Sequence, residues 1–339
     1  MQADIEELED LYATLERFSS LRVLVVGDVM LDAYVWGQVQ NMSAEAPVPI
    51  LLRETETRSL GGAANVAMSL RGLSAQPILC GVVGKDEEGK QLLNQLQENE
   101  IPREGIHISP NRPTTLKTRF VSGTHHLLRL DRESIEPLNK EEEKILWKQI
   151  EKYIPQVHVI LIQDYNKGCL SASLIDKILQ AARERTRPVV VDPKRRNFFR
   201  YQHVSLFKPN LKELTDAMEE SMPVFKMERV EELARNLQER LQASRVLVTL
   251  SERGILALEG ENLQHFPTQA RVISDVSGAG DAVISIAALC TALNLPLSFL
   301  TKLGNIAGSI VCGQKGVAHL DKKSLISFFK ASLGNPGTG

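Results

Sequence analysis

Short apolar runs that end in a polar residue recur along the chain, and segments with apolar residues at helical spacing separate them. A strand that is buried on both faces of a parallel sheet has this continuous apolar character. The first such run, 21–26, closes on Gly27-Asp28. Runs of this kind predict strands over 21–26, 76–83, 157–163, 187–191, 204–207 and 245–250.

The intervening segments place apolar side chains three and four residues apart, which is typical of amphipathic helices. They predict helices over 1–20, 61–73, 86–99, 140–153, 171–185, 230–241 and 282–293. Repeated strand–helix units favour a doubly wound, mostly parallel α/β sheet flanked by helices, with the active site at the carboxyl ends of its strands. We therefore expect a leader helix over 1–20 and one α/β domain over 21–335.

Two further segments, 33–53 and 112–131, have a strand-like pattern that does not fit the main sheet. Pro47 and Pro49 interrupt the first, while the second alternates on both sides of a Ser-Gly-Thr turn. Proline within a run is typical of edge strands, so both segments predict edge strands of a small β-sheet lid. The apolar face of such a lid needs cover, which favours a homodimer formed through the lid.

Composition narrows the class of protein. With 339 residues, of which 43% are hydrophobic, the chain can bury a large core. Its net charge of −2 gives no basic field, so we expect no nucleic-acid partner. No apolar run is long enough to span a bilayer, and the amino terminus lacks a signal-peptide pattern. The four scattered cysteines show no metal-ligand spacing and are typical of buried thiols in a reducing compartment. We predict a cytoplasmic protein with no membrane partner.

The stretch DVSGAGD at 275–281 holds the strongest candidate for catalysis. It runs into an apolar helix, and glycines at a helix start let backbone N–H groups approach an anion. Gly278, Ala279 and Gly280 would thus cradle a phosphate. Asp281 would lie beside it, where a carboxylate takes a proton from a hydroxyl that attacks the phosphate. The alternative is that Asp281 only caps the helix.

A second group of candidates suits a ligand with hydroxyl groups. Asp28 and Asp32 follow the first strand, and carboxylates accept hydrogen bonds from several hydroxyls at once. The Gly61-Gly62 pair allows a ligand close to the backbone, and Asn65 offers both a donor and an acceptor. Turn and capping roles are the alternative for the two aspartates.

Two common nucleotide-binding motifs are missing from the sequence. The chain contains no GxxxxGK[ST] stretch, and the glycines at 81 and 84 lack the spacing of a dinucleotide fingerprint. A P-loop kinase is therefore excluded, and a nicotinamide enzyme is disfavoured.

Three motifs in this order, GGAAN at 61–65, NxxE at 210–213 and DVSGAGD at 275–281, resemble the ribokinase (PfkB) family of sugar kinases. The resemblance runs from Leu21 to about Leu320. It implies a ribokinase-like fold, ATP and Mg²⁺ as cofactors, and ATP-dependent phosphorylation of a sugar. It also implies that Asp281 is the general base and that residues 278–280 form the anion hole for the γ-phosphate.

The same resemblance assigns a nucleotide side. Residues 249–254 resemble the family's TxGxxG loop, with Ser251 in place of its first glycine. Glu213 resembles the family's magnesium organiser. The nucleotide-binding candidates are Asn210, Glu213, Thr249, Ser251, Gly254 and Asn305.

Within the family, the stretches 27–37, 43–50 and 164–168 are closer to the heptose kinases of lipopolysaccharide synthesis than to ribokinases. This implies phosphorylation of O1 of D-glycero-β-D-manno-heptose 7-phosphate. Because the sequence ends at Gly339, we expect another protein to supply the adenylyl step that bifunctional relatives add. Ala44 and the pair His125-His126 depart from the heptose-kinase pattern, so a fructose- or tagatose-phosphate kinase stays open.

A phosphosugar needs cations for its distal phosphate. Lys194 follows a strand end, and Arg119 and Arg129 lie on the lid strands, although solvated strand positions are the alternative for both arginines. The substrate-binding candidates are Asp28, Asp32, Gly61, Gly62, Asn65, Arg119, Arg129, Asp164 and Lys194. The competing class of function is a non-catalytic sugar-phosphate sensor, which would lack the base that Asp281 supplies.

Overall fold

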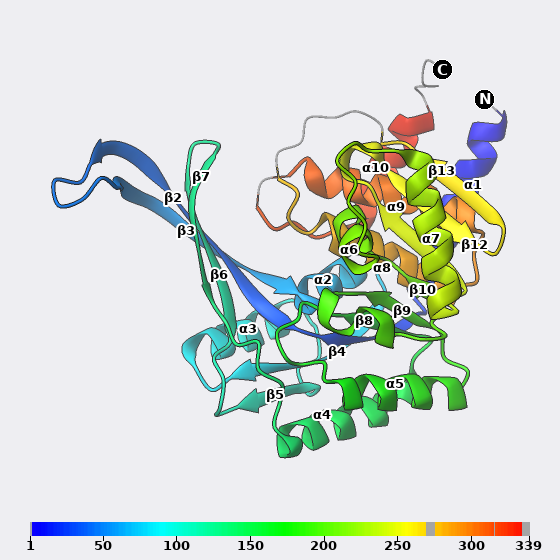
Figure 1. Ribbon diagram of the computed structural model, residues 1–339, viewed down its shortest axis with the longest axis horizontal. Coiled ribbons are helices and arrows are strands. Elements are labelled where there is room, and N and C mark those ends of the chain that lie inside the picture. Colours follow the sequence, from blue (N-terminus) through cyan, green and yellow to red (C-terminus); the bar gives the residue numbers. More distant parts are fainter. Residues whose placement is uncertain (1, 269–274, 315, 334–339) are drawn as a thin grey trace.

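A nine-stranded sheet runs through the centre of the molecule (Figure 1). The structure is a computed structural model that describes residues 2–268, 275–314 and 316–333. The strand order is β13-β12-β11-β10-β9-β8-β1-β4-β5; the pairs β11–β12 and β12–β13 are antiparallel, and the other pairs are parallel. The strands are β1 (Arg22–Gly27), β4 (Gln76–Gly84), β5 (Ile106–Ser109), β8 (Val159–Gln163), β9 (Val189–Asp192), β10 (Leu206–Phe207), β11 (Arg245–Thr249), β12 (Ile255–Glu259) and β13 (Asn262–Phe266). The predicted mostly parallel sheet is confirmed.

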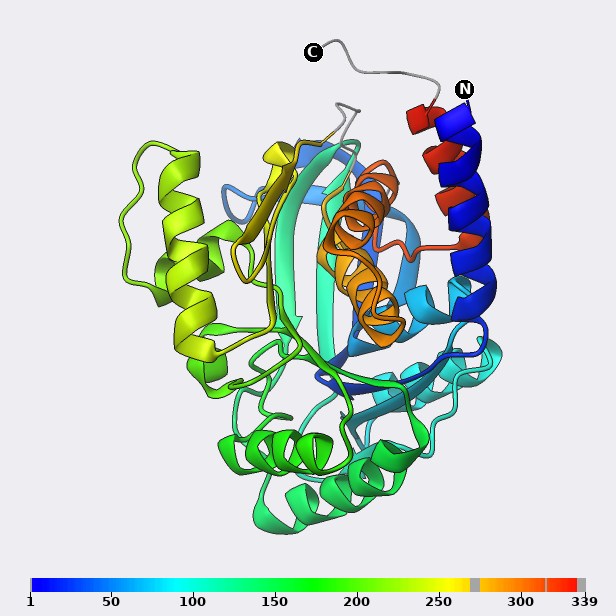
Figure 2. The same cartoon turned by 90° about the vertical axis from the view of Figure 1, so that its right-hand side faces the viewer.

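Helices cover both faces of this sheet (Figure 2). On one face lie α1 (Gln2–Phe18), α2 (Ala63–Gly72), α3 (Glu87–Glu98), α8 (Ala279–Ala292), α9 (Leu297–Cys312) and α10 (Lys322–Leu333). On the other lie α4 (Lys140–Tyr153), α5 (Ala172–Glu184), α6 (Leu211–Ala217) and α7 (Met227–Leu241). Val23 and Val25 of β1 enter the first core, whereas Leu24 and Val26 enter the second. Burial on both faces explains why the parallel strands are continuous apolar runs.

Helix α1 occupies the position of the expected leader helix. Its side chains Leu11, Leu15 and Phe18 are fully buried, and the helix lies beside α10 (Figure 2). Met1 and residues 334–335 of the predicted boundaries lie outside the described residues. In the part of the chain that the structure describes, no helix has both the length and the apolar character needed to cross a membrane.

A separate four-stranded sheet, which we call the lid, projects from the body (Figure 1). Its order is β3 (Pro49–Gly62), β2 (Val29–Met42), β6 (Thr115–Ser122) and β7 (His125–Arg132). The prediction of edge strands is wrong for β2 and β6. β2 pairs with β3 on one side and with β6 on the other, and β6 pairs with β2 and β7. The lid strands also extend beyond the predicted segments, so that Asp32 and the pair Gly61-Gly62 belong to the lid.

Many apolar side chains of the lid are exposed to solvent. Leu128 and Leu130 of β7 are 59% and 58% exposed, and they lie on the face of the sheet that also carries Phe120. Exposed apolar side chains of the lid are Val39, Met42, Val48, Ile50, Leu52, Leu127, Leu128 and Leu130. An apolar patch of this kind is typical of an interaction surface.

Candidate active site

The stretch 275–281 forms the amino terminus of α8 at the carboxyl edge of the main sheet. Gly278 is the N-cap and has a φ of 87°, a conformation that side-chain-bearing residues rarely adopt. A Cβ atom at Gly278 would lie 2.9 Å from the carbonyl oxygen of Ala318 and 3.0 Å from Nδ2 of Asn65. Only glycine fits here. The first backbone N–H groups of α8 lack partners within the helix, and that of Ala279 donates a long hydrogen bond of 3.3 Å to the Val276 carbonyl. N–H groups at a helix start of this kind can bind an anion.

Asp281 lies in the first turn of α8 and is buried. Its Oδ2 accepts a hydrogen bond from Nδ2 of Asn65 at 2.8 Å. Its Oδ1 accepts from the Tyr165 hydroxyl at 2.9 Å and from Nε2 of Gln163 at 3.1 Å. Burial raises the pKa of Asp281 to about 7, although the Asn65 hydrogen bond opposes this shift. A carboxylate with three donors and a pKa near neutrality is suited to accept a proton from a hydroxyl.

Sequence reasoning missed a buried ion pair beneath this turn. Nζ of Lys208, just after β10, lies 3.0 Å from Oδ2 of Asp192, the last residue of β9. Gln163 joins the pair to the base, because its Nε2 also donates to Asp192 Oδ2 at 3.2 Å. Both charged residues stand at the carboxyl ends of strands, which is the signal that singled out Asp28 and Asp164.

The structure gives Asp28 and Asp164 backbone and side-chain partners within the protein. The Asp28 carboxylate accepts from the backbone N–H groups of Tyr165, Lys167 and Cys169 at 2.8, 3.1 and 3.1 Å. Burial, with a contribution from nearby Asp164, raises its pKa to about 6. Both of its oxygens therefore hold the loop after β8 and have little capacity left for a sugar.

Asp164 points to the opposite side of that loop. It accepts hydrogen bonds from the Tyr201 hydroxyl at 2.7 Å, from Nδ2 of Asn197 at 3.2 Å and from the backbone N–H of Asn166 at 2.8 Å. With these partners, Asp164 orders the loop, and its predicted role in substrate binding gains no support from its contacts.

Asp32 and Arg119 face each other across the base of the lid. Nη1 of Arg119 lies 2.5 Å from Oδ1 of Asp32, and the Arg119 guanidinium stacks over the Tyr34 ring at 5.1 Å. A Cβ atom at Gly61 would lie 2.0 Å from Oδ2 of Asp32, so glycine is required for this approach. The Tyr34 hydroxyl donates to Asp275 at 3.1 Å. The lid thus contacts the start of the stretch 275–281.

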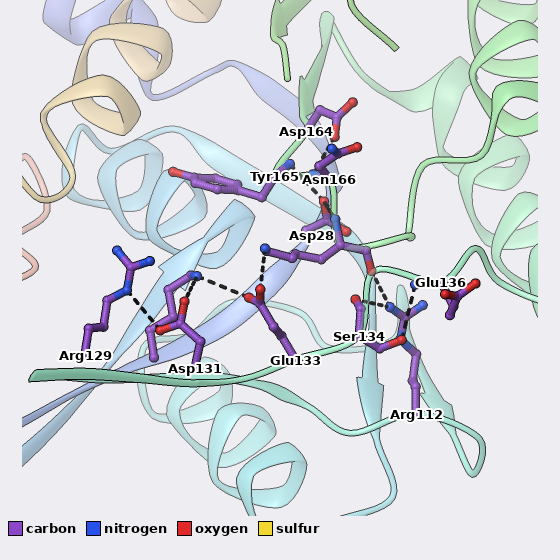
Figure 3. A network of polar contacts seen from close by, with 12 residues as sticks. Asp28, Arg112, Arg129, Asp131, Glu133, Ser134, Glu136, Asp164, Tyr165 and Asn166 are labelled. Carbon is purple, nitrogen blue, oxygen red and sulfur yellow. Dashed lines mark hydrogen bonds and ion pairs between the residues drawn. The ribbon is translucent and has the colours of Figure 1, made fainter. Parts of the chain in front are cut away.

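A chain of ion pairs links β7 to the loop after β8 (Figure 3). Arg129 pairs with Asp131 at 3.0 Å, and Lys117 bridges Asp131 and Glu133 at 3.1 and 3.2 Å. Glu133 continues to Lys167 at 2.7 Å, and the Lys167 backbone holds Asp28. Two of these cations, Lys117 and Lys167, are not among the sequence-based candidates.

Lys194 does not join the lid cations in these ion pairs. Its ammonium pairs with Glu213 and lies 5.5 Å from the centre of the Tyr165 ring. Glu213 and Asn210 form a capping box on α6: the Asn210 side chain accepts from the Glu213 backbone, and the Glu213 carboxylate accepts from the Asn210 backbone. The structure therefore places Lys194 with the nucleotide-side candidates.

The remaining nucleotide-side candidates lie near the end of β11 and in the middle of α9. Thr249 forms an isolated parallel bridge with Asn210. Ser251 adopts a φ of 56°, so the serine in place of the family's glycine takes a left-handed conformation. Gly254 has a φ of 89°, and a Cβ atom there would lie 1.9 Å from the carbonyl oxygen of Phe266. Nδ2 of Asn305 donates to the Pro267 carbonyl at 2.9 Å.

An open groove adjoins these residues. It runs between α1, α9 and α10 and includes Asn305 and Ile306 together with Phe266 and Pro267. Because its walls are mainly apolar, it can accept a flat apolar group beside the polar Asn305 side chain.

A family profile and several known proteins match most of this chain. A profile described as pfkB family carbohydrate kinase matches residues 20–323. Bifunctional protein HldE from Helicobacter pylori strain HPAG1 is 38% identical over 310 residues, which cover 90% of this chain and 66% of that protein. Bifunctional protein HldE from Syntrophotalea carbinolica is 36% identical over 313 residues, which cover 92% and 63%. The chain spans less than two thirds of the length of these relatives.

Solved structures share the fold at low sequence identity. The tetrameric inhibited form of phosphofructokinase-2 from Escherichia coli matches with a TM-score of 0.77 and 18% identity, over 93% of this chain and 100% of that one. Ribokinase from Arabidopsis thaliana, complexed with ribose and ATP, matches with a TM-score of 0.72 and 18% identity, over 91% and 99%. These matches confirm the ribokinase-like α/β fold with its small second sheet.

Proposed function

This chain belongs to the pfkB family of carbohydrate kinases, and from that premise we propose that it transfers the γ-phosphoryl group of ATP to O1 of D-glycero-β-D-manno-heptose 7-phosphate. The product is the 1,7-bisphosphate. The class of reaction, ATP-dependent phosphorylation of a carbohydrate, follows from the family. The heptose rests on the stretches at 27–37, 43–50 and 164–168, and the similarity to the HldE proteins supports it.

The observation that carries the proposed mechanism is the position of buried Asp281 in the first turn of α8, directly after the Gly278-Ala279-Gly280 turn. Asp281 takes the proton of the sugar hydroxyl as its oxygen forms a bond to the γ-phosphorus. The bond between that phosphorus and the β–γ bridging oxygen breaks, and ADP leaves with the electron pair. Backbone N–H groups of Gly278, Ala279 and Gly280 stabilise the charge on the transferred group.

Magnesium fits the phosphate side of this site. The described residues contain no group of three or more His, Cys, Asp or Glu side chains placed to hold a metal ion. Mg²⁺ in kinases is commonly held by one or two carboxylates, substrate phosphates and water. Asp192 and Glu213, which both act electrostatically on the Lys194 ammonium, are the carboxylates that would hold it. When bound, the ion would neutralise charge on the phosphates.

Asp32 and Asn65 are the proposed contacts to sugar hydroxyls, and the lid cations are the proposed contacts to the distal phosphate. Asn65 contacts Asp281 directly, and Asp32 is held by Arg119 on the lid. Arg129 faces the same side of the lid, because it pairs in register with Arg119. Charged donors of this kind bind phosphate oxygens strongly.

A panel of sugars, with and without a distal phosphate, tests the proposed substrate through the rate of ATP consumption. We expect heptose 7-phosphate to give the highest kcat/KM. Arg129→Ala should raise KM for heptose 7-phosphate roughly tenfold, the scale of one charge-assisted hydrogen bond, with KM for ATP unchanged. Faster turnover of a fructose or tagatose phosphate would replace the heptose, and no turnover of any sugar would favour the non-catalytic sensor.

We also propose that the open apolar face of the lid is covered by the lid of a second copy. Light scattering should give the mass of a dimer at micromolar concentration. Leu128→Glu combined with Leu130→Glu should give a monomer, because charges would be buried in the interface. Ile145→Glu on α4, a position that is 43% exposed and distant in sequence from the lid, is the control and should stay dimeric. A monomeric wild-type protein would contradict this proposal.

A further inference from the structure

The buried ammonium of Lys208 stands next to the proposed anion hole. A Cβ atom built on Gly280 would lie 3.7 Å from Nζ of Lys208 and 3.9 Å from Oδ2 of Asp192. Both distances are ordinary van der Waals contacts, so among the described residues the Lys208 ammonium faces Gly280 directly. The Lys208 charge therefore borders the first turn of α8, where the proposed anion hole lies.

The ammonium has fewer partners than its burial requires. An ammonium group has three N–H donors, and a buried charge is costly unless its donors are satisfied. Among the residues that the structure describes, Asp192 is the one group within ion-pair or hydrogen-bond distance of Nζ. Asp192 also accepts from Gln163, so its carboxylate is shared. Lys208 thus retains donors for a further acceptor, and an anion is the acceptor that compensates its charge best.

Lys194 is less suited to this position although it lies nearby. Its side chain is 34% exposed and pairs with Glu213, whereas the Lys208 side chain is 4% exposed. A point charge in a site closed to water acts more strongly on a neighbouring charge than one that faces solvent. The ammonium of Lys208 is also held by Asp192 at the end of β9, whose carboxylate accepts in turn from Gln163 at the end of β8.

We propose that Lys208 is a catalytic residue whose Nζ donates a hydrogen bond to a non-bridging oxygen of the phosphoryl group during its transfer, and that Asp192 and Gln163 are positioning residues that hold this ammonium. The assignment rests on the proposed phosphotransfer but not on the identity of the sugar. Lys208 keeps its proton throughout, since Asp281 takes the proton of the attacking hydroxyl. The alternative is that Lys208 has no catalytic role and only neutralises the charge of the buried Asp192 carboxylate.

The experiment compares Lys208→Met with Lys208→Arg and with Lys212→Met. Lys212 is 83% exposed, pairs with Asp216, and serves as the matched control. The readouts are kcat with the best sugar of the panel, and calorimetric binding of ADP with and without aluminium fluoride, an analogue of the transferred phosphoryl group. We expect Lys208→Met to lower kcat by about 10²–10³ and to weaken analogue binding by a similar factor, while ADP alone binds within about twofold of wild type. Lys208→Arg should recover part of both losses, and Lys212→Met should match wild type.

If Lys208→Met folds poorly, a second variant separates a catalytic role of Lys208 from a role in neutralising Asp192. In the Asp192→Asn background the carboxylate that pairs with Lys208 is absent, so loss of Lys208 there does not leave Asp192 as an unpaired buried charge. The proposal predicts that Lys208→Met still lowers kcat and analogue affinity at least tenfold in that background. Equal values with and without Lys208 would overturn it.

The outcomes also distinguish this proposal from the proposed function. Turnover of another sugar by the wild type removes only the heptose. Turnover by wild type together with unchanged kcat in Lys208→Met removes only the role of Lys208. A wild-type protein that phosphorylates no sugar and binds ADP with aluminium fluoride no more tightly than ADP alone overturns both.

Discussion

Replacement of Asp281 by asparagine is expected to lower kcat by about 10² or more while KM for the sugar changes little. The amide cannot accept the proton of the sugar hydroxyl, but it keeps the size of the carboxylate, and its oxygen can still accept from Tyr165 and Gln163. Steady-state kinetics with ATP and the best sugar of the panel measure the effect. Near-normal turnover in Asp281→Asn would remove the general-base mechanism.

The pH dependence of kcat and of stability tests the role of Asp281 independently. Because burial raises the pKa of Asp281 to about 7, kcat of the wild type should fall roughly tenfold per pH unit below that value and level off above it. The folded-state pKa is above the unfolded value, so the folded protein holds an extra proton between about pH 4 and 7, and stability falls as pH rises through this window. Asp281→Asn should remove this dependence and should be no less stable than wild type at pH 8, which excludes misfolding as the cause of its lost activity.

Replacement of Gly278 by alanine is expected to lower kcat tenfold or more and to destabilise the fold by about 1–2 kcal/mol. The methyl group would be forced into a left-handed conformation and against Nδ2 of Asn65, the donor to Asp281. Kinetics and thermal unfolding measure the two effects separately.

Gly260→Ala is the matched control for Gly278→Ala. Gly260 also has a positive φ, 57°, but no atom lies within 4 Å of its Cβ position in the turn between β12 and β13. It should lose stability by a similar amount and keep wild-type kcat. Equal kinetic losses in the two variants would show that backbone strain, and not the contact with Asn65, is responsible.

The carboxyl edge of the sheet could be predicted because it follows from local pattern. Continuous apolar runs locate the parallel strands, and the residues that end them lie near one another in any doubly wound sheet. The sequence could thus place Asp28, Asp164 and Lys194 at one edge. It could not give the direction of each side chain, so it did not separate Asp28, which holds a loop, from Asp281, which accepts from Asn65 in the first turn of α8.

The pairing of lid strands and of charges could not be predicted from one sequence. The strand β2 has an interior place because β6, which is distant in sequence, pairs beside it, and no local pattern reports such a contact. In the same way Lys194 pairs with Glu213, and Lys208 with Asp192, through segments that the fold alone brings together. The alternation of strands and helices does not predict the strands β12 and β13, because they form an antiparallel hairpin at the end of the sheet.

The most direct test of the account is to identify the product formed from ATP and heptose 7-phosphate by phosphorus NMR. The account predicts one new phosphate resonance coupled to the anomeric proton, formed in equal amount to ADP and absent with Asp281→Asn. ADP formation that yields only inorganic phosphate, or a new phosphate on any other position, would contradict it.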